Sequence, residues 1–239
     1  YSSGRCEMQQ TSELYKSILE EAGHRVQVKV VIAGVEYGEG DIVSLSTSGG
    51  LFTAPGIGSC AAGQVNLTVL PKGDIPRQAK VEPYVRLVTA GRASEWLPKG
   101  KYFIARRSAD KRTGAVTIEG YDAMLKAGQV WLGEDYAGES WPMAQAAAVA
   151  DIAGRMGVEV DSRTVLSAAF PVPCPVDGNG EMLMREVLSA IAVSNAGNWV
   201  MTDEGRLRLI VYGDVPAETS LLVTQDGGAI TFGGVRIIV

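Results

Sequence analysis

The residues best suited to catalysis are carboxylates that lie close to aromatic side chains. Two carboxylates flanking a glycosidic bond can act as general acid and as base or nucleophile. Between residues 131 and 151 the sequence supplies both acids and rings: Glu134, Asp135, Glu139, Asp151, Trp131, Tyr136 and Trp141. A carbohydrate-binding or lytic site is one interpretation. The other, which we favour, is a polar loop at 133–140 whose aromatics anchor it onto the barrel predicted below.

Other chemistry has little support in the sequence. His24 is the single histidine, so a His-dependent triad would have to use it. It follows a predicted helix, where an exposed histidine interacts favourably with the helix dipole. Residues 56–60 (GIGSC) lack the last glycine of a nucleophile elbow. The sequence has neither a GxGxxG nor a Walker pattern.

Metal binding is equally unsupported, because Cys6, Cys60 and Cys174 are widely spaced and form no CxxC pair. We therefore predict a non-enzymatic protein with no catalytic, metal-binding or cofactor-binding residues and no cofactor.

The overall charge argues against nucleic acid as the main partner. The 239 residues carry a formal net charge of -5, whereas phosphate binding needs a basic face. One basic cluster, formed by Arg106, Arg107, Lys111 and Arg112, lies at a predicted hairpin tip. It is either a solvated turn or a contact for an acidic partner or passing DNA. No apolar run reaches the roughly 20 residues that cross a bilayer, so we predict no membrane insertion.

Apolar residues recur at every second position in the first half of the chain, which indicates β-strands. Val26, Val28, Val30 and Ile32 alternate with other side chains in this way. Further strands are predicted at 41–47, 64–70, 80–89, 101–107 and 115–120, joined by turn residues. Short strands connected by loops are typical of an antiparallel barrel or sandwich.

Helical patterns occur at 11–23, 142–156 and 183–195, with Thr11 and Ser140 as predicted caps for the first two. The second helix should bury Ala146, Val149, Ile152, Ala153 and Met156. Asp122 is expected to cap the backbone where strand gives way to helix. A later hairpin pairs 198–202 with 206–212 around Gly205.

The predicted fold class is α+β, an antiparallel β-barrel with a helical insertion between strands and the start of a further β domain. An N-terminal helical segment covers 1–25, and the barrel covers 26–120 and 198–213. The helical insert covers 121–197. Residues 214–239 form a linker and the first strands, at 229–232 and 235–239, of a following, truncated β domain.

Several segments, in this order, resemble phage tail hub proteins. They are 32–37 (IAGVEY), 41–45 (DIVSL), 100–107 (GKYFIARR), 116–124 (VTIEGYDAM), 141–160, 185–192 (REVLSAIA), 197–209 (GNWVMTDEGRLRL) and 230–235 (ITFGGV). The resemblance runs from about residue 26 to the end.

The resemblance implies a homotrimeric ring at the tip of a phage or prophage-derived tail, which joins the tail tube to the tip or spike. It implies tail tube, distal tail and spike or fibre proteins as partners, no specific nucleic acid, and assembly in the host bacterial cytoplasm. Many such proteins carry lytic domains further along the chain, and no such domain is recognisable in this sequence.

Overall fold

The computed structural model describes residues 11–49, 56–132, 141–174, 182–212, 231–232 and 235–236. The chain divides into two units. Thr11–Ile210 form one, and the first ten residues with those from Val211 onward form the other. All side-chain contacts below belong to the first unit or to its last strand.

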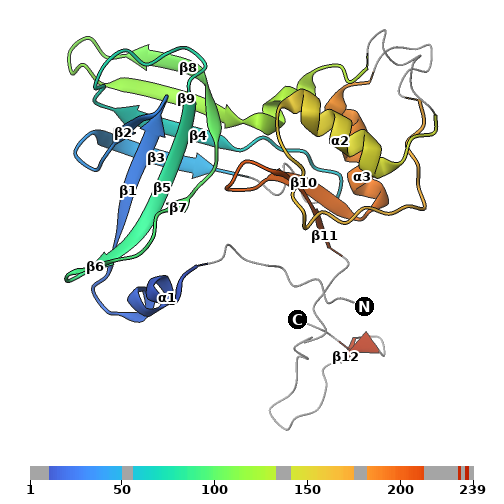
Figure 1. Ribbon diagram of the computed structural model, residues 1–239, viewed down its shortest axis with the longest axis horizontal. Coiled ribbons are helices and arrows are strands. Elements are labelled where there is room, and N and C mark those ends of the chain that lie inside the picture. The colour runs from blue at the N-terminus through green and yellow to red at the C-terminus, as the bar shows by residue number, and fades with distance from the viewer. Residues whose placement is uncertain are drawn as a thin grey trace. The chain divides into compact units, whose positions relative to one another are not determined.

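A nine-stranded antiparallel sheet makes up most of the first unit (Figure 1). Its strands follow the order β2-β1-β5-β8-β9-β4-β3, and the short strands β6 and β7 pair with β5. Their bounds are β1 Arg25–Ile32, β2 Val35–Tyr37, β3 Ile42–Ser48, β4 Gln64–Val69, β5 Lys80–Thr89, β6 Arg92–Ala93, β7 Leu97–Pro98, β8 Tyr102–Ala109 and β9 Val116–Asp122.

One face of this sheet forms the core, as the alternating pattern requires. On β4, Val65, Leu67 and Val69 are buried, while Asn66 between them is exposed. Tyr37 of β2, at one end of the sheet, belongs to the same core, and Leu45 of β3, at the other end, packs against it. The sheet is therefore strongly curved.

The predicted α+β fold with an antiparallel sheet is confirmed. Register shifts between Ile42 and Ser44 and between Ile104 and Arg106 are irregularities of the kind that bends strands. Within the part of the chain that the structure describes, no ladder joins the outermost strands β2 and β3. Closure into a barrel stays a prediction.

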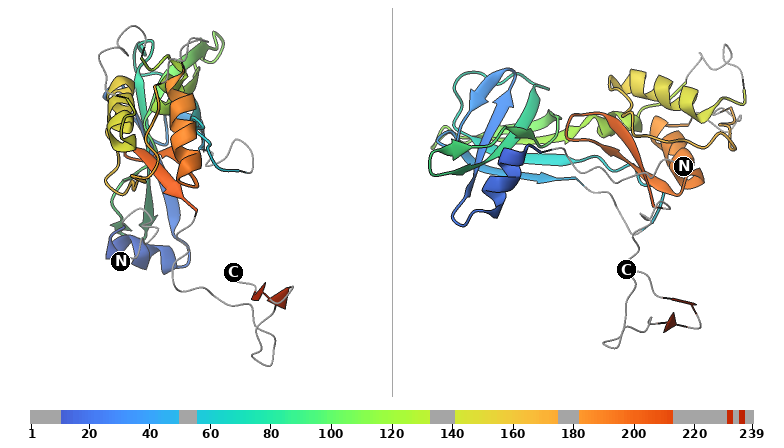
Figure 2. Two further views of the ribbon diagram at one scale, coloured as in Figure 1. Left: turned by 90° about the vertical axis from the view of Figure 1, so that its right-hand side faces the viewer. Right: turned by 60° about the horizontal axis from the view of Figure 1, so that its bottom comes forward.

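The helical elements follow β9. They are the 3₁₀ helix η1 Ala123–Gly128, α2 Gln145–Met156 and α3 Met184–Ser194. Figures 1 and 2 show α2 and α3 beside each other, on the far side of the unit from the β1–β2 end of the sheet. Helix α2 begins later than predicted, and Ala148 is buried in place of Ala146. Its N-cap is Ala144, which makes no side-chain cap bond, and the predicted cap Ser140 lies outside the described residues.

The prediction that 198–213 completes the barrel was wrong in its strand pairing. Strands β10 Gly197–Met201 and β11 Leu207–Val211 pair with each other in a separate sheet. Isolated β-bridges occupy the outer edges of this hairpin. Trp199 of β10 pairs with Cys60, and Leu207 of β11 pairs with Val160. The fully buried Trp199 also donates its indole N–H to the Leu188 carbonyl of α3 at 2.8 Å. This hairpin is thus packed with the helices, although its turn at Gly205 (φ 76°) is as expected.

The N-terminal helix α1 spans Glu13–Glu20, and Ser12, not Thr11, caps it by accepting from the Tyr15 N–H at 3.0 Å. The Ser12 N–H and hydroxyl both donate to the carboxylate of Glu95, and Ile18 is fully buried. These contacts fasten α1 to the segment beside β6.

In the second unit, β12 Thr231–Phe232 pairs antiparallel with β13 Val235–Arg236, within the two strand regions expected there. No described helix is both long and apolar enough to span a membrane.

Candidate functional site

The residues proposed for sugar binding are used for packing where the structure describes them. Trp131 is 1% exposed and meets Trp141 edge to face, with ring centroids 5.8 Å apart. Its indole N–H donates to the Asp151 carboxylate at 2.7 Å, and that same oxygen accepts from Arg155, also at 2.7 Å. A buried ring cannot stack on a sugar, and Asp151 is held in an ion pair. Glu134, Asp135, Tyr136 and Glu139 lie outside the described residues.

Neither His24 nor the 56–60 turn forms a catalytic arrangement in the structure. His24 Nδ1 lies 2.7 Å from the backbone oxygen of Glu21, at the end of α1. Burial raises the pKa of the Cys60 thiol to about 12, so the reactive thiolate is scarce at neutral pH. Among the described residues, no group of three or more His, Cys, Asp or Glu side chains could hold a metal ion.

A polar cavity of about 370 Å³ lies where the large sheet meets β10 and β11. Its titratable lining comes from β8, β9 and two turns: Lys99, Lys101, Tyr102, Asp122 and Asp203. Sequence reasoning identified Asp122 only as a cap, and Asp203 falls in the turn of the predicted 198–212 hairpin. Nothing in their spacing signals the cavity, because the two residues are 81 positions apart in the chain.

Asp122 connects three segments at this cavity. Its carboxylate accepts from the N–H of Gly63 at 2.8 Å and of Met124 at 2.9 Å, so the predicted capping role is confirmed. Its own N–H donates to the Gly63 carbonyl at 2.9 Å. Burial raises the pKa of Asp122 to about 6 despite these hydrogen bonds. The pair Gly63–Asp122 therefore joins β4 and β9 to the start of η1.

The other acidic groups of the cavity follow the same electrostatics. Burial raises the pKa of Asp203, and Lys99, 3.7 Å away, opposes that rise. Burial, together with the negative charges of Asp122 and Asp203, raises the pKa of Tyr102 to about 12. The ion pair of Lys99 with Asp203 connects the segment before β8 to the turn between β10 and β11.

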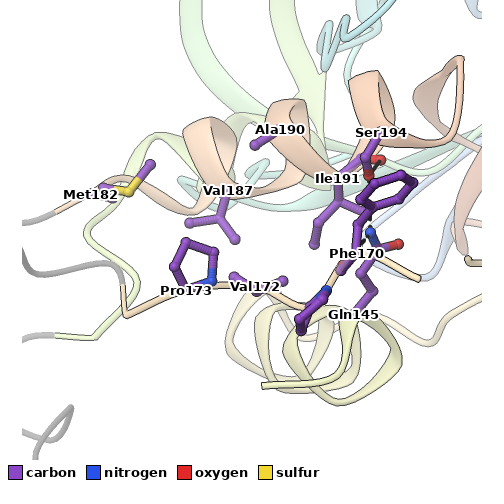
Figure 3. A pocket seen from close by; sticks show the side chains of 10 residues that line it. Gln145, Phe170, Val172, Pro173, Met182, Val187, Ala190, Ile191 and Ser194 are labelled. Atoms are coloured by element: carbon purple, nitrogen blue, oxygen red, sulfur yellow. Dashed lines mark hydrogen bonds between the residues drawn. The ribbon is translucent and has the colours of Figure 1, made fainter. Parts of the chain in front are cut away.

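A smaller apolar groove lies between α3 and the 170–173 segment (Figure 3). Val172, Pro173, Val187 and Ile191 line it, and Phe170 is 57% exposed at its rim. Its volume of about 140 Å³ is below the roughly 300 Å³ typical of small-molecule pockets. The groove is too small for an ordinary cofactor.

Two exposed surfaces of the large sheet are suited to contact with other chains. Strand β3 is outermost in the sheet, has the uncharged sequence IVSLSTS, and exposes 62% of Val43. Natural edge strands usually carry lysine, proline or other features that prevent pairing with a further strand. The other surface is formed by the end of β8 and the turn that follows it. Arg106 and Arg107, predicted at the hairpin tip, lie within β8, whereas Lys111 and Arg112 lie in the turn, and all four are exposed.

No family model matches this sequence, and no curated protein matches it. Among solved structures, the fold is similar to that of the 43 kDa tail protein of prophage MuSo2 from Shewanella oneidensis. The TM-score is 0.53 and the identity 14%, over 83% of this chain and 59% of that protein.

Two further solved structures match with lower TM-scores. A tail protein from Neisseria meningitidis gives a TM-score of 0.47 at 13% identity, over 77% of this chain and 51% of that one. A prophage tail protein from Listeria monocytogenes gives 0.41 at 9% identity, over 84% and 64%. The chain thus spans less than two thirds of the length of each, and at these identities the first match shows a shared fold.

Proposed function

We propose that this protein is a structural component of a phage or prophage-derived tail tip, a ring-shaped hub that joins the tail tube to the tip or spike. The observation that carries this proposal is the fold shared with the MuSo2 tail protein over 83% of the chain. The order of hub-like segments along the sequence supports it independently. In the assembled form, the curved sheet closes into a barrel and the full-length protein is a homotrimer.

The uncharged edge of β3 supports an assembly role. No strand in the described part of the chain pairs with its outer edge. Such an edge favours unwanted pairing in a monomer, whereas in a ring a neighbouring chain covers it. Cyclic oligomers are closed by repeated contacts of this kind.

A non-enzymatic role is part of the proposal. Its support is that Trp131, buried in the core, donates to Asp151 and packs edge to face on Trp141. These three described residues of the candidate sugar site therefore have structural uses that need no substrate.

The test is the mass of the purified full-length protein by light scattering, together with an assay of peptidoglycan release. We expect trimers or a multiple of them, and no solubilisation of peptidoglycan. A stable monomer at all concentrations would contradict the ring. Peptidoglycan cleavage that is lost in Asp151→Asn would contradict the non-enzymatic role.

A further inference from the structure

The end of β8 and the turn that follows it contribute nothing to the core. Every residue from 105 to 114 is exposed, and we call this segment the basic arm. Its tip is fixed by Asp110, whose carboxylate accepts from the Arg112 N–H and the Thr113 hydroxyl, both at 2.8 Å. The N–H of Asp110 donates to the Ala115 carbonyl at 2.9 Å. An arm that is already ordered loses little entropy when it docks.

The arm and the neighbouring turn concentrate positive charge. Lys111 and Arg112 form no ion pair within the described residues, and neither does Arg77. Arg77, Arg106 and Arg107 together line a hollow of about 410 Å³ whose floor includes Ile104. Arg107 reaches Asp74 only at 3.5 Å and Arg106 reaches Glu119 only at 4.0 Å. Such exposed pairs stabilise a monomer little.

The charge pattern favours a protein partner over nucleic acid. Asp74, Asp110 and Glu119 are interspersed among the cations, so a continuous polyanion would meet repulsion along with attraction. Individual carboxylates of a protein surface can pair with the arginines and lysines one by one.

We propose that the basic arm docks on an acidic surface of a neighbouring copy of this chain. The chain as a whole has 27 acidic against 22 basic side chains, and without the five charged residues of the arm the rest of the chain has 26 against 18. A ring is built from heterologous contacts that join two different surfaces of the same molecule. The basic arm is one of these two surfaces. This inference rests on the proposed ring.

The experiment is sedimentation velocity of the full-length protein and of the double variant Lys111→Glu/Arg112→Glu. Neither side chain has an ion pair to lose within the described residues, so the fold should be retained, which circular dichroism checks. We expect the variant to associate at least tenfold more weakly. Raising the salt from about 0.05 M to about 0.5 M should weaken wild-type association, because added ions screen exposed charges.

The matched control is Arg25→Glu/Arg185→Glu, which changes two exposed cations elsewhere and alters the net charge equally. It should associate as the wild type does. Equal association of the arm variant and the wild type would overturn the inference and leave the ring intact. A wild type that never associates would overturn both.

Nucleic acid is tested in parallel by fluorescence anisotropy with a duplex of about 20 base pairs. We expect no binding at about 0.15 M salt. Duplex binding that disappears in Lys111→Glu/Arg112→Glu would overturn the assignment to a protein partner.

Discussion

At the scale of single residues, Asp122 joins parts of the chain that are distant in sequence. It is 9% exposed, and its carboxylate accepts the backbone N–H groups of Gly63 and Met124, which are 61 positions apart. A buried acid of this kind costs free energy when ionised but satisfies donors that would otherwise be unpaired. Its protonation should therefore be visible in the stability of the protein.

We predict that Asp122 makes the folded state less stable as the pH rises from about 4 to about 7. Its folded pKa of about 6 lies above the ordinary value of 3.8, so the folded state holds the proton over this range while the unfolded state releases it. The loss should be about 2 kcal/mol. Urea unfolding of the wild type and Asp122→Asn at pH 4.5 and 7.5 measures it.

The variant keeps only one carbonyl acceptor for the two N–H donors, so it should be less stable than the wild type at pH 4.5. That deficit should shrink by about 2 kcal/mol at pH 7.5. Asp74→Asn, at an 88% exposed side chain, is the control and should show no such change. An equal deficit at both pH values would show that the carboxyl group does not titrate as proposed.

Gly63 should tolerate no side chain. A Cβ there would lie 2.8 Å from the Asp122 carboxylate and 3.4 Å from the Ser48 carbonyl. Gly63→Ala should lower the free energy of unfolding by about 1–3 kcal/mol, because the hydrogen bond to Asp122 must lengthen. Gly73→Ala is the matched control, since nothing lies within 4 Å of its Cβ. Similar effects at both glycines would argue against the close approach.

Trp131 should behave as a core residue and not as a ligand-binding one. Trp131→Ala should cost about 3–5 kcal/mol, in the range of large-to-small core substitutions. Phe170→Ala, at a 57% exposed ring, should cost less than 1 kcal/mol. Thermal unfolding compares the two. A stable Trp131→Ala protein that has lost binding to cell-wall sugar would instead restore the carbohydrate hypothesis.

At the scale of elements, the sequence predicted local structure well and long-range pairing poorly. Period-two alternation placed β4, β5 and β9 within two residues of their ends, because one face of each strand meets the core. The hairpin around Gly205 was predicted equally well, because its turn needs a positive φ, which glycine adopts easily. Local patterns do not say which sheet a hairpin joins. The contacts of Trp199 with Cys60 and Leu188 place the hairpin beside the helices. The first joins residues far apart in the sequence, and the second depends on packing against α3.

The candidate site illustrates the same limit. The capping role of Asp122 follows from its position between strand and helix, but its partner Gly63 is 59 residues away. The aromatic and acidic composition of 131–151 favoured a packing role but left a sugar site open. Only the burial of Trp131 separates the two.

At the scale of elements, the outer edge of β3 leads to a testable prediction. Val43→Lys/Ser46→Lys should leave monomer stability within about 0.5 kcal/mol, because both side chains are exposed. It should weaken self-association of the full-length protein, because lysines on an edge strand oppose pairing with a second strand. Light scattering over a concentration series measures this effect.

The control is Val35→Lys on β2, the outermost strand at the other end of the sheet. That strand has only three residues and already carries the charged Glu36, so it is a poor template for pairing. We expect no change in association there. Equal loss of association with both variants would argue against a specific role for β3.

At the scale of the whole molecule, we propose that function resides in surfaces and not in a catalytic centre. The polar cavity at Asp122 is explained as a joint between the large sheet and the helical part. The uncharged β3 edge and the basic arm remain as features that a monomer does not need. Both are suited to contacts between copies in a tail-tip ring.

The most direct test of this account is the position of the protein in an assembled particle. A gold-labelled antibody against an epitope tag appended to the full-length protein can be imaged on tails by electron microscopy. The account predicts label at the tip of the tail tube, at the junction with the spike. Label distributed along the tube, or particles that lack the protein, would contradict it.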